Sequence, residues 1–374
     1  MRPAGRALAL TSFTAILGVN LLVLIKYAPR AGLSPPLLAA VYTGVVLAGA
    51  FAASRSAAPA PRTARIVFWA VVACSVVGYL VLLNRIPPTN LNVDRWSAIT
   101  SFNDRLLEGR YPYEARTHLG SRVSGLPAVF ALGLPFQWAG DVGYLQVFFL
   151  VAFAAACWKQ GRQRAGAIWA ILFLVTSPAS AWEVAARSDL GTNAIVAVLF
   201  LFLCEHWRHE KTMTRMVGVG VVGGLVASTR LVVVVPMLVY FIGYFGRSER
   251  QKAGVMVGAA MTTFAATLAP FVIWDPHLFL AYNPLTWQAA LTPLWVKVAA
   301  GVAAVAAGVW TEGLAAKCGA SGLIVVGTVL AAFLMSASTV GAERALAFNL
   351  FDISYFDLAL PFLIVPLIAP DGGR

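Results

Sequence analysis

The chain has few charged residues and few cysteines. Of its 374 residues, 12% are charged and 59% are hydrophobic, and the mean hydropathy is +0.77. This composition excludes an ordinary soluble globular protein and indicates a membrane protein. The four cysteines (Cys74, Cys157, Cys204, Cys318) lie in or beside apolar stretches, and no CxxC pair occurs. Buried apolar packing is therefore expected of them, rather than disulfides or metal binding.

The sequence also lacks a recognisable repeat between its halves and a low-complexity tail. Its apolar runs are continuous, as in membrane-crossing α-helices. Twelve such runs are found, near 7–27, 36–54, 66–84, 141–158, 166–181, 192–206, 217–229, 231–246, 253–274, 294–311, 320–341 and 354–369. They predict an all-α, polytopic transmembrane helical bundle of about 12 spans, forming a single membrane domain over residues 1–374. Within it we distinguish N-terminal spans (1–84), a long outer loop (85–140) and the remaining spans (141–374).

The distribution of charge predicts the orientation of this bundle. With the N-terminus inside, the inner segments are 1–6, 55–65, 159–164, 205–215, 247–252, 312–317 and 371–374. They hold sixteen of the 28 basic residues but only five of the 16 acidic ones. Since positive loops stay on the cytoplasmic side, the protein is predicted to lie in the cell's inner (plasma) membrane with both termini on the cytoplasmic side. The net charge of +12 then needs no nucleic-acid partner.

The outer loop is the longest polar stretch of the chain, and two parts of it have recognisable patterns. Trp96, Ile99, Phe102 and Leu106 recur at helical spacing, which predicts an amphipathic helix on the membrane surface that ends at Gly109. The apolar stretch 126–139 is short and contains two prolines, so we interpret it as a re-entrant or interfacial segment. A loop of this size predicts a site at the outer face of the membrane.

Several loop residues could act on a substrate. Asp94 precedes the amphipathic helix, where it could cap the helix, act as a general base, or do both. Tyrosines and arginines at this depth are often interfacial anchors, but their density here also suits recognition of a sugar or a phosphate. These candidates for substrate or phosphate binding are Tyr111, Tyr113, His118 and Arg122. A surface histidine alone is weak support for catalysis.

A second outer turn, WEVAARSDLGTN at 182–193, directly precedes an apolar helix. Arg187 and the positive end of that helix could bind an anion, with Asp189 and Asn193 contacting the substrate. Alternatively, Asp189 or Thr192 caps the helix and Arg187 pairs with Asp189. Arg230 interrupts the run from 217 to 246, which predicts two short limbs that meet at the outer face. It could bind phosphate or pair with Asp189 or Glu183.

The last outer group is close to the C-terminus. It contains Glu343, Arg344, Asp352, Tyr355 and Asp357, which either terminate two helices or close the far side of a cleft. All these clusters fall on the same predicted face of the membrane. Arginines that neutralise a leaving phosphate and a carboxylate that takes a proton are what transfer from a lipid phosphate requires.

Five sequence segments carry a resemblance to a known family. They are Asp94 in the long outer loop, GRYPY from Gly109, with SGLP and LPF between 124 and 136, SDLGTN (188–193), GGLVASTR (223–230) and SYFDLALPFL (354–363). Over roughly 85–370 this arrangement resembles the GT-C superfamily of integral-membrane glycosyltransferases, such as the polyprenol-phosphate-mannose-dependent mannosyltransferases. The resemblance lies in the placement of the motifs more than in a strict signature.

This resemblance implies a GT-C-like fold and an inverting transfer of sugar from a polyprenyl-phosphate carrier on the extracytoplasmic face. Asp94 corresponds to the base, and Asp104 is the substitute. Many members have an acidic pair in this loop, whereas Asn92-Val93-Asp94 offers one acid. No cofactor is therefore implied with certainty, and a divalent metal stays open. The implied partners are a polyprenyl-phosphate-linked sugar, membrane lipids and a glycan or lipid acceptor.

Two other functions fit parts of the sequence. Arg230 in a broken apolar run is a feature of transporters and lipid flippases, although these usually show internal repeats. A non-catalytic membrane subunit could instead present the long loop to a partner. Replacing Asp94 tests the last alternative. If the protein is a non-catalytic subunit, this replacement would leave the activity of its assembly largely intact.

Overall fold

The computed structural model describes residues 3–55, 59–161, 164–208, 212–245, 250–290, 292–347 and 351–368. Parts of most of the predicted inner segments, and the C-terminal residues after 368, lie outside these ranges. The described residues form helices and no strand, apart from an isolated antiparallel bridge between Arg116 and Arg122. The prediction of an all-α fold is confirmed.

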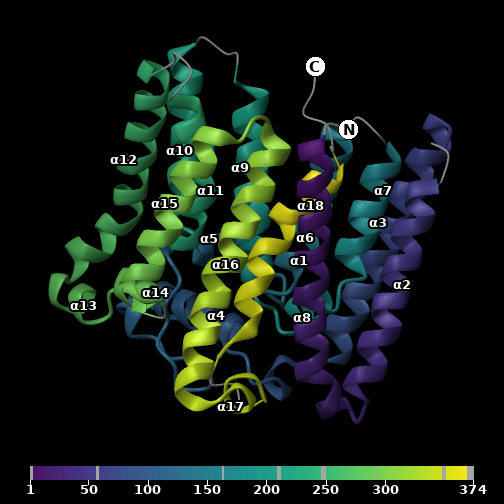
Figure 1. Cartoon of the computed structure of the whole chain (residues 1–374). Coiled ribbons are helices and arrows are strands. Elements are labelled where there is room, and N and C mark those ends of the chain that lie inside the picture. Colours follow the sequence, from purple (N-terminus) through teal and green to yellow (C-terminus); the bar gives the residue numbers. More distant parts are fainter. Residues whose placement is uncertain are drawn as a thin grey trace.

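A helix forms in each of the twelve apolar runs. These helices are α1 (Pro3–Tyr27), α2 (Pro35–Arg55), α3 (Pro61–Arg85), α6 (Tyr144–Gln160), α7 (Arg164–Val175), α9 (Leu190–His206), α10 (Met213–Ala227), α11 (Val234–Phe245), α12 (Arg250–Trp274), α15 (Leu294–Trp310), α16 (Leu314–Val340) and α18 (Leu360–Ile368). In Figure 1 they lie side by side as a bundle, with the first and last helices reaching the end marked N and C. The short helices α4 (Arg95–Leu107) and α17 (Ala342–Ala347) lie at the opposite end, which we call the polar end.

Several of these helices could cross a membrane. In the described residues α1, α2, α3, α12 and α16 are long and apolar enough, and there are up to seven candidates if each of two bent helix pairs counts as one span. Large apolar side chains also stay exposed on α2 and α15, such as Val45 (65%) and Val302 (64%), as expected for a lipid-facing surface. Five other apolar helices have only 10–17 residues, fewer than the roughly 20 that a span needs. The count of twelve spans therefore stays a prediction, because runs such as 192–206 and 217–229 are themselves shorter than a span.

Helices α10 and α12 approach closely through small residues. A Cβ added to Gly224 would lie 2.4 Å from the carbonyl oxygen of Ala260 and 3.0 Å from the backbone nitrogen of Phe264. Because these are backbone atoms of α12, they cannot rotate away as a side chain would. Close contact of this kind is how helices pack where the hydrophobic effect is weak.

We expect Gly224→Ala to destabilise the protein by about 1–3 kcal/mol, because the methyl group forces α10 and α12 apart. Gly218 lies in the same helix with nothing within 4 Å of an added Cβ. Gly218→Ala should therefore gain up to about 1 kcal/mol of helix propensity. Thermal unfolding of the two variants in detergent measures the difference, and equal midpoints would contradict the close α10–α12 contact.

The outer loop forms its own small core at the polar end. Its helix α4 matches the predicted amphipathic helix, and Gly109 follows with a positive φ of 69°. The apolar stripe of α4, however, packs mainly on protein: Ile99 and Phe102 are buried, and Phe102 stacks on Phe130 of α5 (Pro127–Trp138) at 3.7 Å. Phe271 of α12 closes the same cluster, with its ring centroid 5.8 Å from that of Phe102. The expected contact with the membrane surface is thus replaced by contact with α5 and α12, and only Leu106 of the stripe stays exposed.

The apolar run from 217 to 246 is broken, as predicted. Helix α10 ends at Ala227, Arg230 is extended (φ −155°), and α11 begins at Val234. The break is tied to the outer loop by three hydrogen bonds: the Ala128 N–H donates to the Ser228 carbonyl (3.0 Å), and the side chain of Gln288, in α14 (Pro284–Ala290), bridges Leu231 and Ser124 (2.9 and 2.7 Å). The break is therefore held at the polar end.

Candidate functional site

Arg95, the first residue of α4, is the centre of a buried ionic network at the polar end. Its side chain is 9% exposed. One terminal nitrogen, Nη1, donates to the hydroxyls of Ser188 (2.8 Å) and Ser354 (2.9 Å), and the other, Nη2, pairs with Asp352. The guanidinium also lies over the Tyr355 ring, 5.3 Å from its centroid. Arg95 therefore joins the outer loop, the turn before α9 and the 3-10 helix η5 (Ile353–Ala359).

A second buried pair lies next to this centre. Arg230 binds Asp189 with two parallel hydrogen bonds of 2.8 Å, and Asn193 donates to the same carboxylate at 2.6 Å. Burial alone would raise the pKa of Asp189, but the Arg230 guanidinium and these hydrogen bonds hold that pKa below its usual value. Of the two roles predicted for Arg230, the structure thus shows pairing with Asp189. A phosphate-binding role would require this pair to open.

All three guanidinium nitrogens of Arg187 form hydrogen bonds within the protein. Its guanidinium binds Asp141 through Nε and Nη2 (3.0–3.2 Å) and donates to three backbone carbonyls, those of Leu83, Ile86 and Ala185. The expected pair with Asp189 is not formed. Arg187 has a positive φ of 48°, which glycine usually adopts after a helix such as α8 (Pro178–Ala185). The side-chain bonds hold the backbone in this conformation.

The positive end of α9 is occupied by a carboxylate of the protein. Glu183, in α8, accepts the N–H of Gly191 through Oε2 at 2.9 Å. Its other oxygen, Oε1, lies 3.8 Å from Arg95 Nη1. Asp189 is in the capping position of α9 but its side chain forms no capping hydrogen bond. The predicted anion site at this helix end is therefore occupied by the protein's own Glu183 carboxylate.

Asp94 stands at the start of α4, half-buried, and does not cap the helix through its side chain. Its Oδ2 accepts the hydroxyl proton of Thr117 at 2.8 Å, and no hydrogen bond to its other oxygen occurs in the described part of the chain. Thr117 belongs to a short hairpin closed by the Arg116–Arg122 bridge, and the Ser121 N–H donates to the Thr117 hydroxyl (3.0 Å). One carboxylate oxygen is thus fixed and the other is left available.

Arg122 lies on the same hairpin and is exposed. Its guanidinium is 5.1 Å from the ring centroid of Tyr282 and 5.0 Å from that of Trp287, and it donates to the carbonyl of Ala281. No carboxylate pairs with it among the described residues. Of the three arginines predicted to bind phosphate, it is the one whose charge the described residues leave uncompensated.

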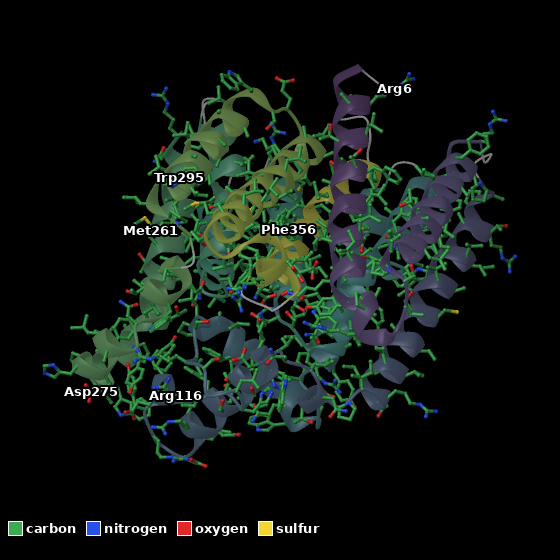
Figure 2. All side chains as sticks on the ribbon, turned by 60° about the horizontal axis from the view of Figure 1, so that its bottom comes forward. Arg6, Arg116, Met261, Asp275, Trp295 and Phe356 are labelled. Carbon is green, nitrogen blue, oxygen red and sulfur yellow. The ribbon has the colours of Figure 1, made fainter. Side chains whose placement is uncertain are left out.

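The other predicted site residues are dispersed. His118 is exposed, bonds Ser97 (2.7 Å) and lies against Trp96, while Tyr111 and Tyr113 are buried in the aromatic core of the outer loop. Asp104 is exposed and accepts from Gln137 at 2.7 Å. Arg344, in α17, is exposed as well. Figure 2 shows nitrogen and oxygen atoms gathered between Phe356 and the segment that contains Arg116.

The sequence candidates did not include several residues of the site, among them Arg95, Thr117, Asp141 and Gln146, whose side-chain amide donates to the Ser188 carbonyl. Arg95 lies on the polar side of an amphipathic pattern, which predicts exposure. Asp141 and Gln146 lie at the edge of an apolar run, where no pattern reveals a partner. No group of three or more His, Cys, Asp or Glu that could hold a metal occurs in the part of the chain described.

No protein-family model matches this chain, and no curated protein or solved structure matches it.

Proposed function

We propose that the protein is a membrane glycosyltransferase of the GT-C type, which moves a sugar from a polyprenyl-phosphate carrier to an acceptor hydroxyl on the extracytoplasmic face. Asp94 acts as the general base, through the oxygen that Thr117 does not bind. In this reaction the acceptor oxygen attacks the anomeric carbon, its proton passes to Asp94, and the bond to the polyprenyl phosphate breaks.

The arrangement of the 116–122 hairpin carries this proposal. It positions Asp94 through Thr117 and carries Arg122 on its other side, opposite Arg116. A carboxylate that can take a proton and a cation that can bind a phosphate are thereby joined by a few residues. Tyr282 and Trp287, which flank Arg122, offer aromatic faces of the kind on which sugars stack.

The proposal is tested with the full-length protein in lipid vesicles and synthetic polyprenyl-phosphate sugars. Mass spectrometry of the lipid fraction should show release of free polyprenyl phosphate and a sugar-bearing acceptor. Comparing lipid-linked sugars from cells with and without the gene identifies the natural donor. Intact donors after prolonged incubation, across the common hexoses, would exclude a glycosyltransferase.

Arg122→Ala is expected to raise the KM for the donor about tenfold or more, because a charge-assisted hydrogen bond to phosphate contributes roughly 1.5–3 kcal/mol. Arg110→Ala is the matched control, since Arg110 is exposed and pairs with Glu108 in the same loop. Initial rates at varied donor concentration measure both variants. Equal KM values for Arg122→Ala and the unsubstituted protein would remove Arg122 from the phosphate site.

Transport is the second candidate, and broken helices favour it. The α10–α11 break and the bent pair of α7 and α8 (55°) lie beside buried charges, as in many transporters. Uptake of a lipid-linked sugar into vesicles without any change in its mass would support transport and contradict transfer.

A further inference from the structure

A cavity of about 50 Å³ lies among α6, α8, α9 and η5, and Glu183, which contacts Arg95, is one of its lining residues. A buried water needs roughly 10–15 Å³ of such space, so the cavity holds several particles of that size. Tyr79 of α3 and Leu174 of α7 complete its apolar wall. It is distinct from the region of Asp94 and Arg122, neither of which lines it.

Four buried residues that line this cavity carry oxygens that lack a hydrogen-bond partner. These atoms are Gln146 Oε1, Glu183 Oε1, Thr192 Oγ1 and both carboxylate oxygens of Asp357. The four residues are between 1% and 7% exposed. An unsatisfied buried polar group costs about 1–3 kcal/mol, and native proteins contain few of them. Five in one cavity indicate that a ligand belongs there.

The arrangement of donors fixes the orientation of two of these groups. The amide nitrogen of Gln146 donates to the Ser188 carbonyl, so its oxygen must face another partner. Glu183 uses Oε2 for the N–H of Gly191, which leaves Oε1 with the 3.8 Å ionic contact to Arg95 and no hydrogen bond. Apart from the Thr192 hydroxyl, the unpartnered atoms are acceptors only. They require a positively charged or proton-donating occupant.

The charges of the network indicate the sign and magnitude of the charge on that occupant. Three buried cations, Lys26, Arg95 and Arg230, face three buried carboxylates, Glu183, Asp189 and Asp357, and the partly exposed carboxylate of Asp352. Arg187 and Asp141 compensate each other separately. With all seven groups ionised, the network is one positive charge short of neutrality, and either a bound cation or a proton held between Glu183 and Asp357 would supply that charge. A buried uncompensated charge is costly, which favours a monovalent occupant.

We propose that this cavity binds one monovalent inorganic cation, such as sodium or potassium, through oxygens of Gln146, Glu183, Thr192 and Asp357. An all-oxygen ligand set suits hard cations. A divalent ion would leave the network with an excess positive charge, and the five unpartnered oxygens are fewer than the roughly six to eight that calcium takes. The bound ion would hold η5 against α8 and α9. This inference does not depend on the proposed glycosyltransferase activity.

Thermal unfolding of the full-length protein in detergent tests the site. At constant ionic strength, sodium or potassium chloride should raise the midpoint by several degrees relative to N-methyl-D-glucamine chloride, and the increase should saturate. Thr192→Val removes one oxygen at nearly constant volume, so it should raise the salt concentration that gives half of the shift at least tenfold. Asp357→Asn should abolish the shift. Glu205→Gln, a carboxylate replacement elsewhere on α9, should retain it.

Direct binding of radioactive sodium or rubidium, near one ion per chain and lost in Asp357→Asn, gives a second readout. Identical midpoints in all the salts, together with no bound ion, would overturn the proposal. A midpoint that depends on pH but on no cation would assign the cavity to a proton shared by Glu183 and Asp357. Stabilisation by magnesium or calcium alone would overturn the monovalent assignment.

Discussion

Asp94→Asn is expected to reduce sugar transfer by about 10²–10⁴-fold, the usual contribution of a general base. Asparagine has the same shape and can still accept the hydrogen bond of Thr117, so the hairpin and helix α4 should be retained. Since the acceptor hydroxyl would lose its proton acceptor, kcat should fall while the KM for the donor changes little. Initial rates with a polyprenyl-phosphate sugar measure both quantities.

Glu108→Gln is the matched control, because Glu108 is an exposed acid that follows the same helix and pairs only with Arg110 among the described residues. It should keep full activity. Near-normal turnover in Asp94→Asn, at equal expression and equal thermal stability, would reject Asp94 as the base. Loss of activity in Asp104→Asn alone would transfer the role to Asp104.

Arg230→Met is expected to destabilise the protein by about 3–5 kcal/mol, because it leaves the Asp189 carboxylate buried without its cation. The same cost applies to Asp189→Leu, which leaves Arg230 unpaired. The double variant should be more stable than either single variant, since a buried pair can be replaced by apolar groups at little cost. Thermal or denaturant unfolding in detergent gives the three values.

An exposed pair provides the comparison. Arg110→Met removes a partner of Glu108, and both side chains are more than half exposed. Its effect should stay below about 1 kcal/mol. If Arg230→Met were equally mild while donor binding weakened strongly, Arg230 would bind phosphate and its pairing with Asp189 would be a resting arrangement.

The local features of the sequence predict much of the fold. The apolar runs locate the helices, Gly109 follows the end of α4, and the buried arginine at 230 marks the break between α10 and α11. These features depend on short-range patterns of residue type. The number of spans is less well predicted. Some apolar runs are too short to cross a membrane, and others, such as 166–181 and 354–369, continue through a bend or a 3-10 helix. Five apolar helices are too short to be counted as spans by themselves.

The side-chain pairing in the site does not follow from local sequence patterns. The sequence indicates that Asp189, Arg187 and Arg230 are close together, but pairing depends on the direction in which each side chain leaves its backbone. Arg187 turns to Asp141, 46 positions away, and leaves Asp189 to Arg230. Arg95 is the clearest omission, since an arginine on the polar face of an amphipathic helix is expected to face water. The Asp94–Thr117 bond depends on a hairpin whose closure no local pattern reveals.

The three hydrogen bonds between the outer loop and the α10–α11 break have a mechanical consequence. Because Ala128 is bonded to Ser228, and Gln288 bonds both Leu231 and Ser124, the loop cannot lift from the bundle at this edge without releasing the segment that contains Arg230. This edge of the loop is therefore tethered to the bundle, and any movement of the loop here would act directly on the backbone next to the Arg230–Asp189 pair.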